Sequence, residues 1–209
     1  MHSVKQIELA NAVFRRLMRY GTQHELATQL VAAAAFQVGF ARIAAGMARW
    51  SREPNGHNEM QARLSNEQFD VLMLAPVDAA ARSAVSCMDL CAAAAYRLTG
   101  AVPQPHGQES DIQRLRKSVK DKSASLGSSQ DTWLRALVGA ADWQLLIKVR
   151  TAVTHHAIKS LSILGTVPAV TSLIIDGKPY DNIDLTQRFA ELAENQFDGF
   201  TAAVLQDFP

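Results

Sequence analysis

The sequence predicts an all-α fold: an up-and-down bundle of four to five long helices, with a small β-hairpin-like insert before the last helix. Alanine-rich segments with helical spacing of their apolar residues dominate the 209 residues, and glycine or proline separates them. A hydrophobic content of 48% is enough for a sizeable core. The one clear β signal comes late in the chain. We expect a single domain over residues 1–209.

Two helices are predicted in the first 50 residues. The first covers residues 4–20 and ends at Gly21, and its apolar stripe consists of Ile7, Ala10, Val13, Phe14 and Leu17. The second covers residues 23–50, with a break near Gly39 or Gly46 as the alternative to one continuous helix. Its apolar positions are Leu26, Leu30, Phe36, Phe40, Ile43 and Met47. Small alanine and glycine residues between them would let a neighbouring backbone approach closely.

A polar stretch then separates these helices from the third. Residues 51–65 contain Pro54 and Gly56 and are predicted to form a surface loop. A short helix is expected to begin at Asn66, and a third long helix follows Pro76 and stops at Gly100. Cys87 and Cys91 stand four residues apart on this helix, which suits two buried, reduced thiols better than a disulfide or a metal pair.

The second half contains the motif helix, the insert and the terminal helix. The motif helix covers about residues 130–160, either as one helix or as a bent pair around Gly139, and residues 128–131 have the spacing of a capping box. The insert covers about 166–183, where Asp176 and Gly177 break a β-branched run. The terminal helix covers about 185–206, with Asp184 and Gln187 expected to cap it.

Charge and composition exclude several classes of partner. The 21 basic and 20 acidic residues give a net charge of +1, so the chain as a whole has no electrostatic drive toward nucleic acid or membrane. We find no secretory signal, and the longest apolar stretch, at residues 30–36, is too short to span a bilayer. The sequence therefore predicts a cytoplasmic protein without membrane contact.

The common signatures of metal and nucleotide enzymes are missing from the sequence. It contains no glycine-rich phosphate loop, no GxSxG elbow, no HExxH and no paired CxxC. Neither a metal nor a cofactor is predicted.

The stretch KVRTAVTHHAIKS, residues 148–160, is the strongest candidate for chemistry. Adjacent helical residues point about 100° apart, so His155 and His156 cannot chelate one metal together. Thr151 and His155 stand four residues apart on one face, and Arg150 flanks that face. Histidine can remove a proton near neutral pH and arginine can stabilise a phosphorane-like transition state, which suits metal-free phosphodiester cleavage. The alternative is that these cations only interact with the dipole at a helix C-terminus.

An arginine followed after four residues by a histidine, near the end of a late helix, resembles the signature of the HEPN domain superfamily. The motif match covers about residues 142–160, and the resemblance elsewhere is architectural. It implies a homodimer whose composite cleft cleaves RNA through attack of the 2′-hydroxyl, without a metal. Arg150 would stabilise the scissile phosphate, His155 would be the acid and base, and Thr151 would occupy the position of the family's polar residue. His156 is the alternative acid and base, because the family also tolerates a gap of five residues.

Other readings of the sequence stay open. A HEPN-like helical dimer without activity would bind RNA, a nucleotide or a partner protein, and a bundle unrelated to HEPN would carry the motif by accident. A nucleotidyltransferase antitoxin is the partner expected for a toxin of this family. A basic island could follow an RNA backbone or be an ordinary solvated helix or loop; its residues are Arg114, Arg116, Lys117 and Lys120.

Overall fold

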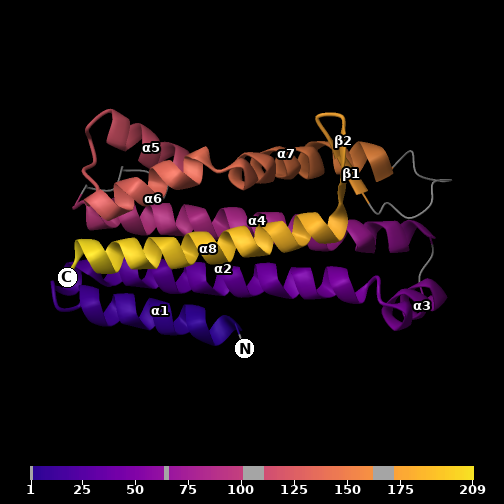
Figure 1. The fold of residues 1–209 in the computed structure, drawn as a ribbon, viewed down its shortest axis with the longest axis horizontal. Coiled ribbons are helices and arrows are strands. Elements are labelled where there is room, and N and C mark those ends of the chain that lie inside the picture. The colour runs from indigo at the N-terminus through magenta and orange to yellow at the C-terminus, as the bar shows by residue number, and fades with distance from the viewer. Residues whose placement is uncertain (1, 64–65, 101–110, 162–171) are drawn as a thin grey trace. The chain divides into compact units, whose positions relative to one another are not determined.

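The computed structural model describes residues 2–63, 66–100, 111–161 and 172–209 (Figure 1), without the side chains of residues 2–3, 60–61, 66–73 and 152–161. Over these residues the fold is all-α with one two-stranded hairpin before the last helix, which confirms the predicted fold class. The helices are α1 (His2–Leu17), α2 (Glu25–Trp50), α3 (Pro54–Arg63), α4 (Asn66–Leu98), α5 (Ile112–Lys120), α6 (Ser128–Gly139), α7 (Ala141–Leu161) and α8 (Asn182–Asp207). A 3-10 turn, Thr22–His24, precedes α2, and strands β1 (Ser172–Ile175) and β2 (Lys178–Asp181) precede α8.

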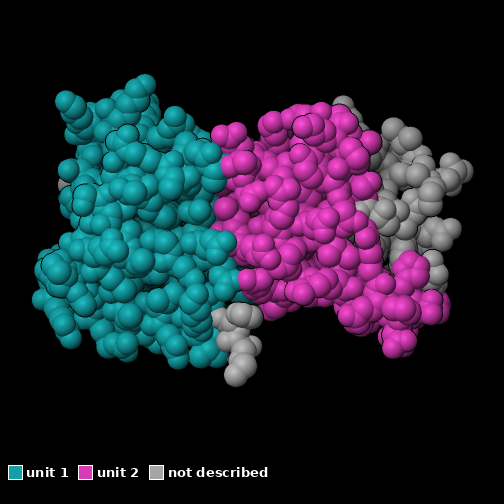
Figure 2. All heavy atoms as spheres, viewed as in Figure 1, with its two compact units in different colours: residues 1–39, 85–140, 193–209 teal, residues 40–84, 141–192 magenta. Residues whose placement is uncertain are grey.

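The chain divides into two compact units (Figure 2). Unit 1 comprises residues 1–39, 85–140 and 193–209, and unit 2 comprises residues 40–84 and 141–192. Helices α2, α4 and α8 each contribute residues to both units. Each unit has its own buried residues and its own polar contacts.

The second part of α8 forms the centre of unit 1. Phe197 and Phe200 are fully buried there, and the ring of Trp133 on α6 lies 4.8 Å from that of Phe200. The indole Nε1 of Trp133 also donates a hydrogen bond to the carbonyl oxygen of Gln196, at 3.1 Å. From α1, the buried Gln6 amide donates to the carboxylate of Glu194, at 3.3 Å. Helix α8 therefore joins α1 and α6 within this unit.

Unit 2 contains α7, the hairpin and the start of α8. The strands pair antiparallel with Ile175 opposite Lys178. The turn residues Asp176 and Gly177 have φ values of 51° and 75°, as a two-residue type I′ turn requires. The hairpin predicted from the Asp-Gly signal is thus confirmed. The part of the predicted insert at residues 166–171 lies outside the described residues.

The predicted loop at residues 51–65 was wrong, because α3 occupies residues 54–63. Proline is favoured at the first position of a helix, where its missing N–H costs nothing, and Pro54 stands there. Arg63 then pairs with Glu59 one turn earlier, at 2.9 Å. Gly56 fits closely under the end of α2, because a Cβ at this position would lie 2.2 Å from the carbonyl oxygen of Trp50.

The breaks in the long helices also differ in part from the prediction. Helix α4 runs from Asn66 through Pro76 without interruption, and α2 continues through Gly39 and Gly46. The predicted motif helix is the bent pair, α6 and α7, separated by the extended backbone of Ala140. Cys87 and Cys91 are both free and buried, as expected.

Two predicted helix caps were wrong. The carboxylate of Asp207, at the end of α8, accepts hydrogen bonds from the first turn of α6, and no side chain within residues 128–131 caps it. Asp181, not Asp184, caps α8, since its Oδ1 accepts from the N–H groups of Ile183 and Asp184 at 2.8 and 3.2 Å.

The core face predicted for α2 was wrong in most of its residues. Of the six apolar positions predicted, only Leu30 is buried, and the others are exposed: Leu26, Phe36, Phe40, Ile43 and Met47. The buried face of α2 consists mainly of small residues, among them Ala34, Ala41, Ala44, Ala45 and Ala48. Alanine side chains allow close helix packing, so the larger side chains remain on the opposite face. On α1, Ile7 and Phe14 of the predicted stripe are likewise exposed.

Candidate functional site

Helix α7 carries the candidate motif and is anchored by one apolar face. Trp143, Leu146 and Val149 are buried at intervals of three residues. Because residues three or four apart share a helix face, these side chains lie on one side of α7, and Leu145 beside them is buried as well. Arg150 and Thr151, the two motif residues whose side chains are described, are both exposed.

The Arg150 guanidinium is exposed. No hydrogen bond or ion pair joins it to another residue in the described part of the chain. Thr151 differs, because its hydroxyl donates to the carbonyl oxygen of Ile147 on the preceding turn, at 2.9 Å. Its oxygen can therefore accept a hydrogen bond from a ligand, while its one proton is already used.

His155 and His156 lie on the α7 backbone, but their side chains are outside the described residues. The helix extends to Leu161, so Thr151 and His155 stand one turn apart along it. Arg150 precedes the end of the helix by about three turns. A helix dipole acts on charges in its last turn only, so the dipole does not account for Arg150.

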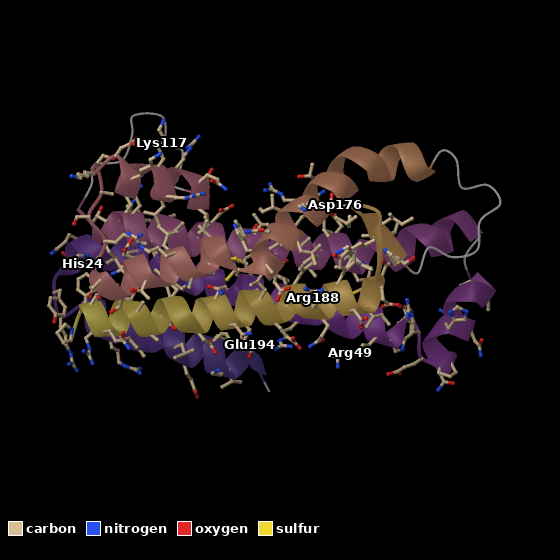
Figure 3. The ribbon with its side chains drawn as sticks, turned by 45° about the horizontal axis from the view of Figure 1, so that its top comes forward. His24, Arg49, Lys117, Asp176, Arg188 and Glu194 are labelled. Carbon is tan, nitrogen blue, oxygen red and sulfur yellow. The ribbon has the colours of Figure 1, made fainter. Side chains whose placement is uncertain are left out.

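Two ion pairs involve helix α7, and all four of their residues belong to unit 2. Lys148 on α7 pairs with Asp176 at the hairpin turn, and this hydrogen bond raises the pKa of the Lys148 ammonium. Asp142, at the start of α7, pairs with Arg188 on α8. Figure 3 shows Asp176 beside α7 and Arg188 on α8. The sequence did not reveal the Lys148–Asp176 contact, which joins residues 28 positions apart.

The basic island forms helix α5 in unit 1. Ile112 and Leu115 are buried beneath it, and Asp111 caps it by accepting from the Arg114 N–H at 2.8 Å. The four basic side chains predicted for RNA are all exposed: Arg114, Arg116, Lys117 and Lys120. Lys117 extends away from the ribbon in Figure 3. This is an amphipathic helix with a positively charged outer face.

The hollow nearest the hairpin does not include the motif. It measures about 350 Å³ and is lined by β2 and the first two turns of α8, including Tyr180, Asp184 and Arg188. Neither Arg150 nor Thr151 lines it.

One helical segment in the described part of the chain, Thr22–Trp50, is long and apolar enough to cross a membrane. In the most apolar part of this segment, 44% of the residues are buried inside the protein. Core helices of soluble proteins can be as long and as apolar as this segment.

Comparisons of the chain with protein-family models, with curated proteins and with solved structures found no match.

Proposed function

We propose that this protein is a HEPN-like, metal-independent endoribonuclease with a composite site at a homodimer interface. The observation that carries the proposal is the exposed guanidinium of Arg150, which has no partner in the described part of the chain and stands within the Arg-x4-His spacing. An unpaired arginine with open access can bind a phosphate through two parallel hydrogen bonds.

In the proposed reaction, the His155 imidazole takes the proton of an RNA 2′-hydroxyl, and the 2′-oxygen attacks the adjacent phosphorus. The bond between phosphorus and the 5′-oxygen breaks, and that oxygen takes a proton from the imidazole of the second copy. The products are a 2′,3′-cyclic phosphate and a 5′-hydroxyl, so no metal, oxidant or cofactor is consumed. Arg150 stabilises the charge that develops on the phosphate oxygens.

Other parts of the proposal concern partners and location. The exposed cations of α5 offer an RNA backbone a sequence-independent contact that salt would weaken. A nucleotidyltransferase antitoxin would be the neutralising partner if the protein is a toxin. The protein would act in the cytoplasm.

One observation favours a second function, a dimer that binds RNA, a nucleotide or a partner protein without cleaving. The Thr151 hydroxyl donates to Ile147, so it has no proton left to give to a phosphate oxygen. An amide at this position would keep separate donors and an acceptor. Phosphate binding by Arg150 does not require the missing donor, whereas orientation of the reacting groups does.

The test is incubation of purified protein with mixed RNA in the presence of a chelator, followed by analysis of the RNA ends. We expect 2′,3′-cyclic phosphate ends, with a loss of about 100-fold or more in rate for Arg150→Ala. The matched control is Arg82→Ala, which removes an exposed arginine of the same unit that is paired with Asp78. Equal loss in both variants, or no cleavage by the wild type, would refute the enzymatic proposal. Retained RNA binding without cleavage would support the second function.

A comparison of His155→Ala with His156→Ala identifies the acid and base. We expect His155→Ala to abolish cleavage and His156→Ala to retain it. The reverse result would assign the role to His156.

A further inference from the structure

A row of large apolar side chains lies exposed along the second part of α2. We call it the α2 stripe and define it as Phe40, Ile43, Met47 and Trp50. Their exposed fractions are 55%, 60%, 52% and 45%. All four belong to unit 2.

The α2 stripe cannot turn inward without exposing another apolar face. The opposite side of the same segment is buried, with Ala41, Ala44 and Ala48 at most 4% exposed. A helix that is apolar on two sides is normally covered on both sides. One copy of the chain covers only the alanine side, in the residues that the structure describes. An exposed patch of this kind on a monomer marks an interaction site.

The spacing of the α2 stripe matches that of a helix-pairing seam. Its members follow one another at intervals of three, four and three residues, which is the 3.5-residue period of alternating a and d positions. Gly46 lies beside the stripe, and a Cβ built on it would meet no atom within 4 Å. The glycine leaves room for a side chain from a facing helix.

We infer that the α2 stripe binds the α2 stripe of a second copy of this chain. A two-fold contact places the same surface on both partners, so the surface must be complementary to itself. The α2 stripe satisfies this condition because none of its members is charged, and two identical copies meet without repulsion between like charges.

The exposed area is large enough for such a contact. Aromatic side chains have about 150–250 Å² of surface, so four half-exposed side chains of similar size present roughly 400 Å² per copy. Two copies would therefore bury roughly 800 Å² through these four side chains alone, before the residues around them are counted, which is in the range of a weak interface between copies.

This contact is distinct from the proposed ribonuclease site, because the α2 stripe belongs to α2 and Arg150 belongs to α7, so the two share no residue. The inference does not depend on the proposed function, and each can fail without the other.

The test compares the mass in solution of the wild type with that of Phe40→Glu/Met47→Lys, measured by sedimentation over a wide concentration range. This pair of changes leaves the net charge unaltered and places unlike charges in the α2 stripe. We expect the variant to have half the mass of the wild type and a dissociation constant for the copies raised by at least about 100-fold. The control, Ala75→Glu/Ala79→Lys, places the same charges on exposed positions of α4 in the same unit and should keep the wild-type mass.

If the charged variant loses its helical circular dichroism, Phe40→Ser/Met47→Ser replaces it as a milder change with the same expected result. A wild type that stays monomeric at every concentration would overturn the inference, and so would a folded variant that keeps the wild-type mass. A monomeric wild type that floats with phosphatidylcholine vesicles would also overturn it, by assigning the α2 stripe to a lipid surface. RNA cleavage, measured in parallel, reports on the proposed function only.

Discussion

Removal of the Asp207 carboxylate should destabilise unit 1, because this side chain caps a helix distant in sequence. Its Oδ1 accepts from the Ser129 N–H and its Oδ2 from the Gln130 N–H, both at 3.0 Å. These donors lie in the first turn of α6 and have no partner within the helix. The residue that precedes α6, Gly127, makes no side-chain cap, and a Cβ there would lie 2.1 Å from Asp207. The capping therefore depends on the end of α8.

The expected loss of unfolding free energy follows from the number of hydrogen bonds that Asp207 accepts. Replacing one N-cap side chain with alanine costs about 0.5–2 kcal/mol, and Asp207 makes two charge-assisted bonds at the positive end of a helix. We therefore expect Asp207→Ala to lower the free energy of unfolding by about 2 kcal/mol. Asp207→Asn keeps one acceptor oxygen and should lower it by about 1 kcal/mol. For a chain of this size, the alanine variant should melt about 4–8 °C lower.

The stabilisation that Asp207 provides should decrease as the pH falls. Partial burial raises the pKa of Asp207, but the hydrogen bonds from Ser129 and Gln130 outweigh it and hold the pKa below its ordinary value. A carboxyl whose pKa is lower in the folded state stabilises the fold above its unfolded pKa, about 4. That contribution disappears as the pH falls through the folded pKa. The difference between wild type and Asp207→Asn should therefore be full at neutral pH and shrink in acid.

The assay is urea unfolding followed by far-ultraviolet circular dichroism, at neutral pH and at a series of acidic values. Asp78→Ala is the control, because it removes a surface ion pair between Asp78 and Arg82 within one helix, worth about 0.3–0.5 kcal/mol. The reasoning would be refuted if Asp207→Ala cost no more than this control, or if its cost did not change between neutral and acidic pH.

Two further predictions concern backbone strain and thiol burial. Gly177 has a φ of 75°, so Gly177→Val should destabilise the hairpin by about 1–2 kcal/mol, whereas Gly177→Asn should cost less. Thermal melts of the two variants check this, and equal losses would contradict it. Cys87 and Cys91 are at most 1% exposed, and burial, together with the hydrogen bond to Cys87, raises the pKa of Cys91. Neither thiol should react with Ellman's reagent until the protein is unfolded in urea, and fast labelling of the native protein would show that the thiols are accessible.

Features that depend on nearby residues could be predicted from the sequence. The hairpin turn needs two residues with positive φ, and the Asp176–Gly177 pair provides them. Helix α5 was likewise predictable, because Ile112 and Leu115 share one face and the basic residues occupy the other. Each of these signals lies within a dozen residues, so no knowledge of tertiary contacts was needed.

The helix caps depend on distant contacts and could not be predicted in this way. Asp207 and the Ser129 N–H group that it caps are 78 residues apart in the sequence. The capping-box spacing at residues 128–131 suggested instead that side chains within this segment would cap α6. The face of α2 could not be assigned for a related reason. Apolar periodicity shows which positions share a face, but alanine on the opposite face packs against neighbouring helices as well. Only the positions of those helices decide which face is buried.

The local charge pattern distinguishes Arg150 from three other arginines on the helix surfaces. Arg63, Arg82 and Arg135 each pair with an acidic residue four positions earlier, at 2.7–2.9 Å. The acidic partners are Glu59, Asp78 and Asp131. Four positions before Arg150 stands the buried Leu146, so the helix itself offers no counter-charge. Such pairs stabilise a helix by a few tenths of a kcal/mol, so the absence of one costs little stability. In the residues that the structure describes, the Arg150 guanidinium has no acidic partner, which is compatible with the phosphate-binding role that we propose for it.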